Sequence, residues 1–247
     1  MFFTRGGSRC GIRLFVSSGV PDPIPFFCPR ASAVATCASV AKPAPIQSID
    51  PRHPQPRHIQ RAVGILHDGG IVSYPTDTYY ALGCDVFQKK ALQRLAALKR
   101  RDERKPFAFL CADLGEVAKY GIVSNESYRL MRRLLPGPYT FVLDATRLVP
   151  RTALTRQRQV GIRVPDAPVA TALVLGLGRP LATTSASIPG EEPLTDAAAI
   201  QERLGHGVDL ILDGGVTLNE PSTVIDLTGP SPVVLRAGKG RLEGGVA

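Results

Sequence analysis

The sequence of 247 residues has little or none of several features that mark common classes of protein. No apolar run approaches the roughly 18 residues that a membrane-spanning helix needs, so we expect no membrane segment. The five cysteines include no CxxC pair and are odd in number, which favours free thiols in a reducing, cytoplasmic setting over a disulfide framework. The four histidines show no HExxH or other ligand spacing, so we expect no metal ion held by protein side chains alone.

The motifs of several large enzyme classes are missing as well. There is no Walker A loop and no GxGxxG after an apolar strand, and Gly214-Gly215 is only a turn signal. No histidine lies near a cluster of hydroxyl and acidic residues, which argues against a Ser-His-Asp nucleophile. The chemistry that remains needs no enzyme nucleophile, because cations and hydroxyls would hold anionic substrates together.

Residues 1–50 differ in composition from the rest of the chain. They are rich in proline, serine and arginine, contain almost no acid, and lack the periodicity that would bury one face of an element. We therefore predict a disordered N-terminal extension over residues 1–50 and a folded domain over residues 51–247. The same composition resembles an organellar transit peptide, and a start codon upstream of the native one would leave a similar segment. Both origins stay open.

The positive charge belongs mainly to the predicted domain. Residues 1–50 contribute five cations and two acids to the formal net charge of +9, so residues 51–247 keep +6. A positive surface favours anionic partners such as nucleotides, RNA or acidic lipid, although it can equally serve solubility.

From about residue 55, apolar periodicity predicts helices mixed with strands. The expected helices cover residues 59–66, 89–100, 124–135, 168–175 and 195–204. The expected strands cover residues 71–74, 107–111, 139–145, 160–164, 181–185, 208–212, 222–227 and 232–236. Some strands follow one another too closely for a crossover helix, so the sequence predicts an α/β fold with a mixed sheet.

Polar side chains gather where the predicted strands end. The run SYPTDTYYALG (73–83) follows the first strand, and Pro75 is expected to end regular pairing there. The other clusters are a basic run at a helix end (99–105), Arg163 inside an apolar run, the segment TTSAS (183–187), and Ser222-Thr223 with Arg236 beside the last two strands.

Each cluster has a structural explanation when it is taken alone. Cations at a helix C-terminus complement the helix dipole, as Lys99 and Arg101 would. Arg163 could face solvent on the alternate side of its strand, and Asp77 could be a turn acid. Serine and threonine often bond to nearby backbone. Together, however, the clusters put hydroxyls and cations at strand ends, where open α/β sheets bind ligands.

The order of the motifs is more specific than any one of them. The order is PTDT-x-Y-x-L-G (75–83), K-x-R (99–101), PGP-x-T (136–140), IRVP (162–165), TSA-S-x-x-G (184–190), and STVIDL (222–227) ahead of LR-x-G (235–238). By these residues the chain resembles the YrdC/YciO family from about residue 59 to residue 240. It looks closer to the YciO branch, by the run TDTYYALGC (76–84) and by the departures at Ala81, Lys105 and Ser187. The resemblance implies a strongly twisted, largely open mixed sheet with flanking helices around a concave basic cavity.

The resemblance also implies the activity of an L-threonylcarbamoyladenylate synthase, which is a nucleotidyltransferase. Such an enzyme condenses L-threonine, bicarbonate and ATP to threonylcarbamoyl-AMP and pyrophosphate, and Mg²⁺ accompanies the nucleotide. Partner proteins of tRNA modification then transfer the threonylcarbamoyl group to adenosine 37 of tRNA. The alternative is a non-catalytic module of the same fold that binds double-stranded RNA or the ribosome.

The site residues that the family implies carry over by position. Lys99 and Arg101 match the K-x-R motif, which meets the ATP phosphates and the carboxylating centre, and they are the expected catalytic residues. The expected threonine ligands are Thr76, Thr78, Arg163, Thr183 and Ser222. The expected ATP ligands are Lys99, Arg101, Lys105, Ser185 and Arg236. Ser187, Ala81 and Lys105 stand where the family usually has Asn, Gly and Asn, and these departures bear on the efficiency of adenylate formation.

Overall fold

The structure, a computed structural model, describes residues 43–100, 107–154, 157–188 and 190–242. These residues belong to one compact unit of the chain. Two of the expected site residues, Arg101 and Lys105, lie outside the described residues, and so does most of the expected N-terminal extension.

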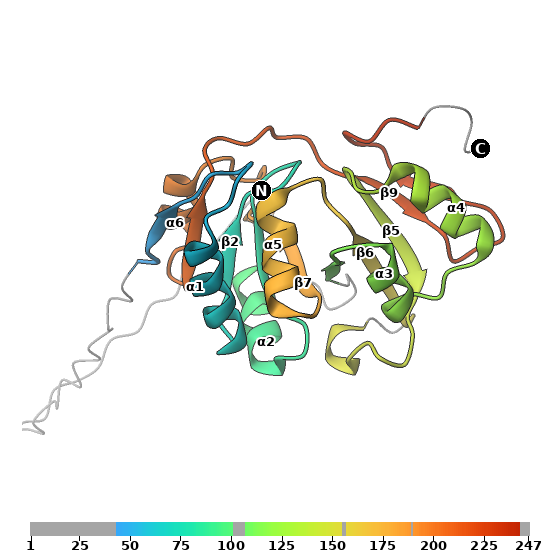
Figure 1. The fold of residues 1–247 in the computed structure, drawn as a ribbon, viewed down its shortest axis with the longest axis horizontal. Helices are drawn as coiled ribbons and strands as arrows, with labels where there is room; N and C mark the ends of the chain where they lie inside the picture. Colours follow the sequence, from blue (N-terminus) through green and yellow to red (C-terminus); the bar gives the residue numbers. More distant parts are fainter. Residues whose placement is uncertain (1–42, 101–106, 155–156, 189, 243–247) are drawn as a thin grey trace, which may run out of the picture. The chain divides into compact units, whose positions relative to one another are not determined.

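The described strands form one ten-stranded open sheet, shown in Figure 1, with the order β1-β8-β2-β3-β7-β4-β6-β5-β9-β10. The strands are β1 (Ile46–Ser48), β2 (Val72–Tyr74), β3 (Ala81–Asp85), β4 (Ala108–Leu110), β5 (Tyr139–Asp144), β6 (Gln159–Arg163), β7 (Leu181–Ser185), β8 (Leu210–Asp213), β9 (Thr223–Asp226) and β10 (Val233–Arg236). Five of the strand pairs are antiparallel and four are parallel. The mixed α/β sheet predicted from the sequence is therefore confirmed.

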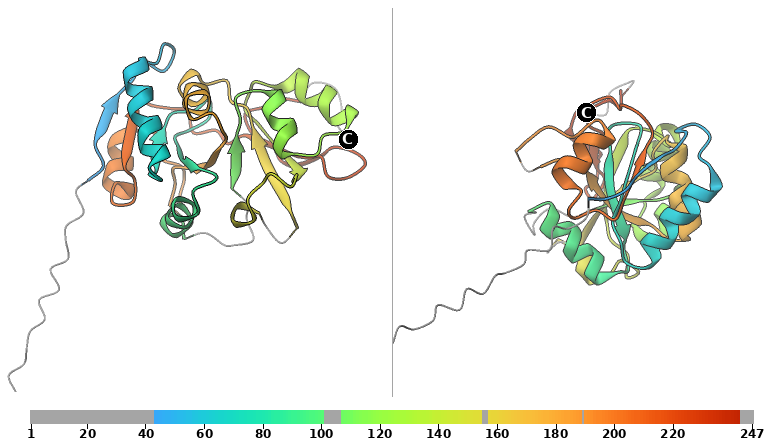
Figure 2. Two further views of the ribbon diagram at one scale, coloured as in Figure 1. Left: turned by 60° about the horizontal axis from the view of Figure 1, so that its bottom comes forward. Right: turned by 90° about the vertical axis from the view of Figure 1, so that its left-hand side faces the viewer.

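Helices cover both faces of the sheet. They are α1 (Pro56–His67), α2 (Lys89–Leu98), α3 (Leu114–Tyr120), α4 (Asn125–Leu134), α5 (Pro168–Leu177) and α6 (Ala197–Leu204), with a short 3₁₀ helix at Arg151–Ala153. Helices α1 and α5 pack together on one face, and α2 and α6 lie on the other (Figure 2, right). Ala81 packs in the cluster under α1 and α5, and Leu82 packs with α2 on the opposite face. This alternation is the two-residue period of a strand buried on both sides.

The helix boundaries follow local signals in the sequence. Asp113, Ser124 and Asp196 precede α3, α4 and α6, and each side chain accepts a hydrogen bond from the N–H three residues on. Helix α5 begins at Pro168 and ends at Leu177, and it is capped by Gly178, whose φ of 70° is the left-handed conformation that glycine adopts most easily. These residues fix where α3, α4, α5 and α6 begin and where α5 ends.

Three elements differ from the sequence-based expectation. Strand β3 was not expected, because all five of its residues are buried and show no polar alternation. Helix α3 was also missed. Strand β1 was assigned to the disordered extension, but it runs parallel to β8, with Ile49 N donating to Asp213 O at 2.8 Å.

The domain boundary expected at residue 51 is therefore too late. Ala44 and Ile49 are buried in the two core clusters of the domain, at 2% and 4% exposure. A three-residue strand among prolines carries no periodicity, and its partner lies far away in the sequence, so only the long-range pairing identifies it. Among the described residues, no helix is long and apolar enough to cross a membrane.

Candidate functional site

The loop between β2 and β3 carries the hydroxyls of the PTDT motif. Thr76 Oγ1 donates to Tyr79 O at 2.6 Å and lies 3.0 Å from Thr78 Oγ1. Thr78 N donates to Thr76 Oγ1 at 3.3 Å, and Thr78 is fully buried. These bonds give the loop one conformation, so the local bonding expected of threonine in a turn is present here.

Arg163, at the end of β6, reaches this loop. Its Nη2 donates to Asp77 Oδ1 and, at 2.9 Å, to Thr78 Oγ1. The side chains of Arg163 and Asp77 are each only 8% exposed, so this arginine does not face solvent and this acid is more than a turn residue. Asp77 Oδ2 also accepts from Asp166 N at 3.3 Å. Arg163 Nε is buried and has no partner among the described residues, so one N–H of the guanidinium is left unsatisfied.

Lys99 follows α2, and its side chain crosses to the end of β7. The Nζ group donates to Ser185 O at 2.9 Å, to Ser187 Oγ at 2.7 Å, and to Ser187 O. Ser185 Oγ and Ser187 Oγ lie 3.0 Å apart. Lys99 is 9% exposed, so it does more than complement a helix dipole at the surface. Lys99 of the K-x-R motif and Ser185 of the TSAS motif, 86 residues apart in the sequence, therefore lie in one cluster.

Thr183 is already bonded within the protein. Tyr74 Oη donates to Thr183 Oγ1 at 2.9 Å, and both residues are buried. Burial raises the pKa of the Tyr74 phenol well above its ordinary value, so the phenol remains a donor. Gly83 allows this arrangement, because a Cβ there would lie 2.8 Å from the Tyr74 ring.

Tyr80 is not among the site residues that the motifs imply. It connects the loop between β2 and β3 to the segment after β8. Its Oη donates to Gly215 O at 2.7 Å, accepts from Gly214 N at 3.0 Å, and lies 3.3 Å from Asp213 Oδ1. Burial raises the pKa of this phenol to about 12. A buried tyrosine needs a hydrogen-bond partner for its hydroxyl. A tyrosine in an apolar stretch of sequence is therefore the signal that could have indicated this contact.

Ser222 and Arg236 meet at the start of β9. Arg236 donates to Ser222 O from Nη2 at 2.9 Å and from Nε at 3.2 Å. Ser222 Oγ lies 2.9 Å from Thr140 Oγ1, which belongs to the PGP-x-T motif. The cluster of Ser222 and Arg236 is therefore hydrogen-bonded to strand β5 through Thr140.

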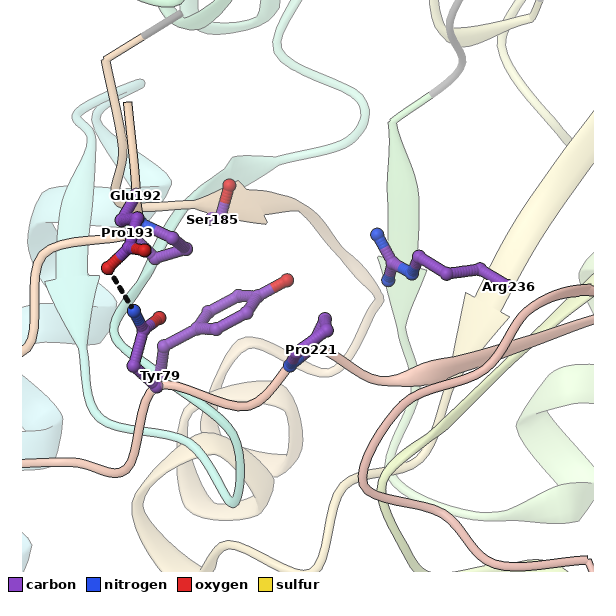
Figure 3. A pocket seen from close by; sticks show the side chains of 7 residues that line it. Tyr79, Ser185, Glu192, Pro193, Pro221 and Arg236 are labelled. Atoms are coloured by element: carbon purple, nitrogen blue, oxygen red, sulfur yellow. Dashed lines mark hydrogen bonds between the residues drawn. The ribbon is translucent and has the colours of Figure 1, made fainter. Parts of the chain in front are cut away.

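A cavity of about 350 Å³ opens between these groups. It is lined by Tyr79, Ser185, Glu192, Pro193, Asn219, Pro221 and Arg236. Figure 3 shows Arg236 on one side and the Tyr79 ring, Ser185 and Pro221 on the other, and Glu192 Oε2 accepts from Asn219 Nδ2 at 3.0 Å. One arginine and one glutamate are its charged lining residues, so the basic character expected of the cavity stays a prediction.

The expected site residues that the structure describes differ in how they lie relative to the cavity. Ser185 and Arg236 line the cavity. Thr78, Lys99, Arg163, Thr183 and Ser222 are buried and are not among its lining residues, and Thr76 is half-buried. No three histidine, cysteine, aspartate or glutamate side chains gather as a metal site in the part of the chain that the structure describes.

Comparison with known proteins agrees with this architecture. The sequence matches the Sua5/YciO/YrdC family, described as telomere recombination, over residues 64–238. It is 44% identical over 197 residues to the uncharacterized protein YciO of Escherichia coli K12, which is 79% of this chain and 96% of YciO. It is 36% identical over 179 residues to the threonylcarbamoyl-AMP synthase of Chromobacterium violaceum, which is 72% of this chain and 92% of that protein.

Two solved structures show the same fold. The crystal structure of E. coli YciO matches with a TM-score of 0.78 at 42% identity, over 81% of this chain and 98% of that one. Pyrococcus abyssi Sua5 complexed with L-threonine matches with a TM-score of 0.75 at 31% identity, over 79% of this chain and 58% of that one. The motifs, the sheet order and these matches agree, and the chain belongs to the Sua5/YciO/YrdC family.

Proposed function

We propose that the protein is an L-threonylcarbamoyladenylate synthase, which joins L-threonine, bicarbonate and ATP and releases pyrophosphate. The observation that carries this proposal is the cluster of Lys99, Ser185 and Ser187 beside a cavity that Arg236 also lines. Relatives named threonylcarbamoyl-AMP synthase, and a structural neighbour that binds L-threonine, support the choice of substrates.

The reaction brings three anionic species together. The amine of threonine adds to the carbon of bicarbonate, which loses water to leave a carbamate. A carbamate oxygen then attacks the α-phosphorus of ATP, and pyrophosphate leaves. No protein nucleophile is needed, so alignment and stabilisation of negative charge are the main tasks of the site.

The polar residues can divide these tasks. We propose that Arg163 binds the carboxylate of threonine, that Thr76 and Thr78 face its amine and hydroxyl, and that Thr183 and Ser222 support this pocket. Ser185 and Arg236, at the cavity, would contact ATP, with Arg101 and Lys105 of the undescribed segment. ATP would bring Mg²⁺ on its own phosphate oxygens.

Lys99 is the proposed centre of charge stabilisation. Its ammonium bonds to acceptors on both Ser185 and Ser187, and Ser187 Oγ also lies within reach of Ser185 Oγ. A substrate oxygen could replace Ser187 Oγ as an acceptor for the Lys99 ammonium at the least cost, because the Ser187 hydroxyl would still be hydrogen-bonded to Ser185 Oγ. The lysine would then stabilise charge that develops on the phosphate or carbamate oxygen.

The direct test is pyrophosphate release from ATP, with threonine and bicarbonate omitted in turn. The proposal requires both, and serine should be the poorer amino acid because a pocket shaped for a β-methyl loses roughly tenfold or more without it. Equal release with and without threonine would contradict the proposal.

A second candidate function is RNA binding, which would also suit an enzyme that serves tRNA modification with partner proteins. Helix α4 exposes Arg129, Arg132 and Arg133, and none of them forms an ion pair within the described residues. With the +6 charge of residues 51–247, this face could contact phosphates.

The RNA test measures binding to a short RNA duplex as salt increases. Replacing Arg129 and Arg133 by glutamine should reduce the slope of log affinity against log salt by roughly 2. The matched control replaces Arg57 and Arg61 on α1, which have the same i, i+4 spacing. Binding that is insensitive to salt, or equal effects of the two pairs, would contradict a phosphate contact on α4.

A further inference from the structure

The chain after β10 turns back onto the site and is anchored to the sheet by its backbone. Thr223 Oγ1 accepts from Gly238 N at 3.1 Å and donates to Gly240 O at 2.7 Å. Lys239 N donates to Pro221 O at 2.8 Å, and Tyr139 Oη donates to Arg241 O at 2.7 Å. A Cβ on Gly240 would lie 2.3 Å from the Tyr139 ring, so the segment is closely packed. These contacts hold residues 238–241, the return segment, without help from the Lys239 side chain.

The side chain of Lys239 points from this segment to the PTDT loop. Its Nζ donates to Asp77 O at 2.5 Å, across 162 residues of sequence. Arg163 holds the carboxylate of the same aspartate. Two cations therefore flank Asp77, one at its backbone carbonyl and one at its side chain.

The charges at this point do not balance. Lys239 and Arg163 bring two positive charges, and Asp77 supplies one negative charge. The side chains of Arg163 and Asp77 are almost fully buried. Asp166, whose N–H also meets Asp77, has an exposed side chain that forms no ion pair among the described residues. Arg163 Nε is buried without a partner. Lys239 is half-buried, and taking a cation partly out of water is costly unless an anion completes the group.

We propose that Lys239 is a substrate-binding residue, and that it and Arg163 together hold the carboxylate of the amino-acid substrate. This rests on the proposed function and adds to it a residue that lies outside the shared sequence motifs. A planar carboxylate can accept from a guanidinium and an ammonium at once. The hydroxyls of Thr76 and Thr78 lie in the same loop, so the amino acid would be bound by both ends.

The test compares Lys239→Met, which keeps the length and removes the charge, with Lys239→Arg, which keeps the charge. Lys89→Met, an exposed lysine on α2, is the matched control. We measure KM for threonine and for ATP in pyrophosphate release, the melting temperature, and the calorimetric affinity for L-threonine and for L-threoninol, which lacks the carboxylate.

We expect Lys239→Met to raise KM and Kd for threonine about tenfold or more, because a charge-assisted hydrogen bond is lost. The KM for ATP and the melting temperature should not change, affinity for L-threoninol should not fall, and Lys239→Arg should recover most of the loss. Unchanged threonine affinity would overturn the inference. A joint change of both KM values with a lower melting temperature would also overturn it, because the lysine would then only fasten the segment.

Failure of the proposed function would look different. Wild-type protein that binds threonine without threonine-dependent pyrophosphate release would contradict the synthase, and the calorimetric comparison would still decide on Lys239. Wild-type protein that binds no threonine would overturn both proposals.

Discussion

Arg163 on β6 and Asp77 in the loop between β2 and β3 form a buried ion pair, although they lie 86 residues apart. The pair joins the two halves of the sheet at the loop that carries the PTDT hydroxyls. A buried charge that loses its partner is expensive, because neither water nor another group replaces the contact.

Arg163→Met should therefore lower the free energy of unfolding by about 3–5 kcal/mol, as should Asp77→Asn. Urea denaturation measures this change. Arg203→Met is the control, because its ion pair with Glu191 is 42% and 46% exposed and is worth at most about 1 kcal/mol. Equal effects of the buried and the exposed pair would show that Asp77 does not depend on Arg163.

The second prediction concerns the K-x-R motif. Lys99→Met and Arg101→Met should each reduce threonine-dependent pyrophosphate release roughly a hundredfold or more per folded molecule, because each removes charge stabilisation from the transition state. Arg101→Lys should also be damaging, since an ammonium does not reproduce a planar guanidinium on phosphate oxygens. Arg104→Ala, in the same basic run, should have little effect. If Arg104→Ala matched Arg101→Met, the run would act only as diffuse charge.

The third prediction concerns the N-terminal strand. A chain that starts at residue 51 lacks β1 and should be less stable than one that starts at residue 43 by about 3 kcal/mol or more. The shorter chain loses buried Ala44 and Ile49, and it leaves Ile211 N and Asp213 O without their partners. Thermal unfolding of the two chains measures the difference. Equal melting temperatures would place the domain boundary at residue 51 after all.

The fourth prediction is a loss of stability in alkali. Burial raises the pKa of Tyr80 from near 10 to about 12, and that of the Cys84 thiol from near 9 to about 12. Below pH 9 both groups are protonated in the folded and the unfolded chain, so their contribution is fully present. Between about pH 9 and pH 12 the unfolded chain releases these protons first, so the free energy of unfolding falls as pH rises.

Tyr80→Phe isolates one part of this effect. The variant should lose about 1 kcal/mol at pH 8, because Gly214 N and Gly215 O lose the phenol hydroxyl. Its stability should then fall less steeply than that of the wild type between pH 10 and pH 12. Urea denaturation at several pH values gives both numbers. Parallel curves for the two proteins would mean that Tyr80 does not titrate differently on folding.

Local patterns in the sequence were sufficient for the fold class and for most of the elements. Helix α5, for example, is bounded by Pro168 and Gly178, and both signals act within one or two residues of the helix ends. The polar clusters could be located for the same reason, since each lies in or directly after a helix or strand that its own apolar pattern reveals. Periodicity failed at β3, which is buried on both faces, and at β1, which is held by β8 rather than by its own residues.

Only the tertiary structure decided which polar groups meet. The sheet order puts the start of β3 beside the end of β7, and that register places Tyr80 next to Ala186. Lys99 then reaches Ser187, and Lys239, which directly follows the LR-x-G motif, reaches Asp77. Such contacts depend on strand order, register and the path of the chain beyond its last strand. The local sequence therefore determined which positions of the chain carry cations and hydroxyls. Long-range packing determined that two of the cations, Arg163 and Lys239, both contact Asp77.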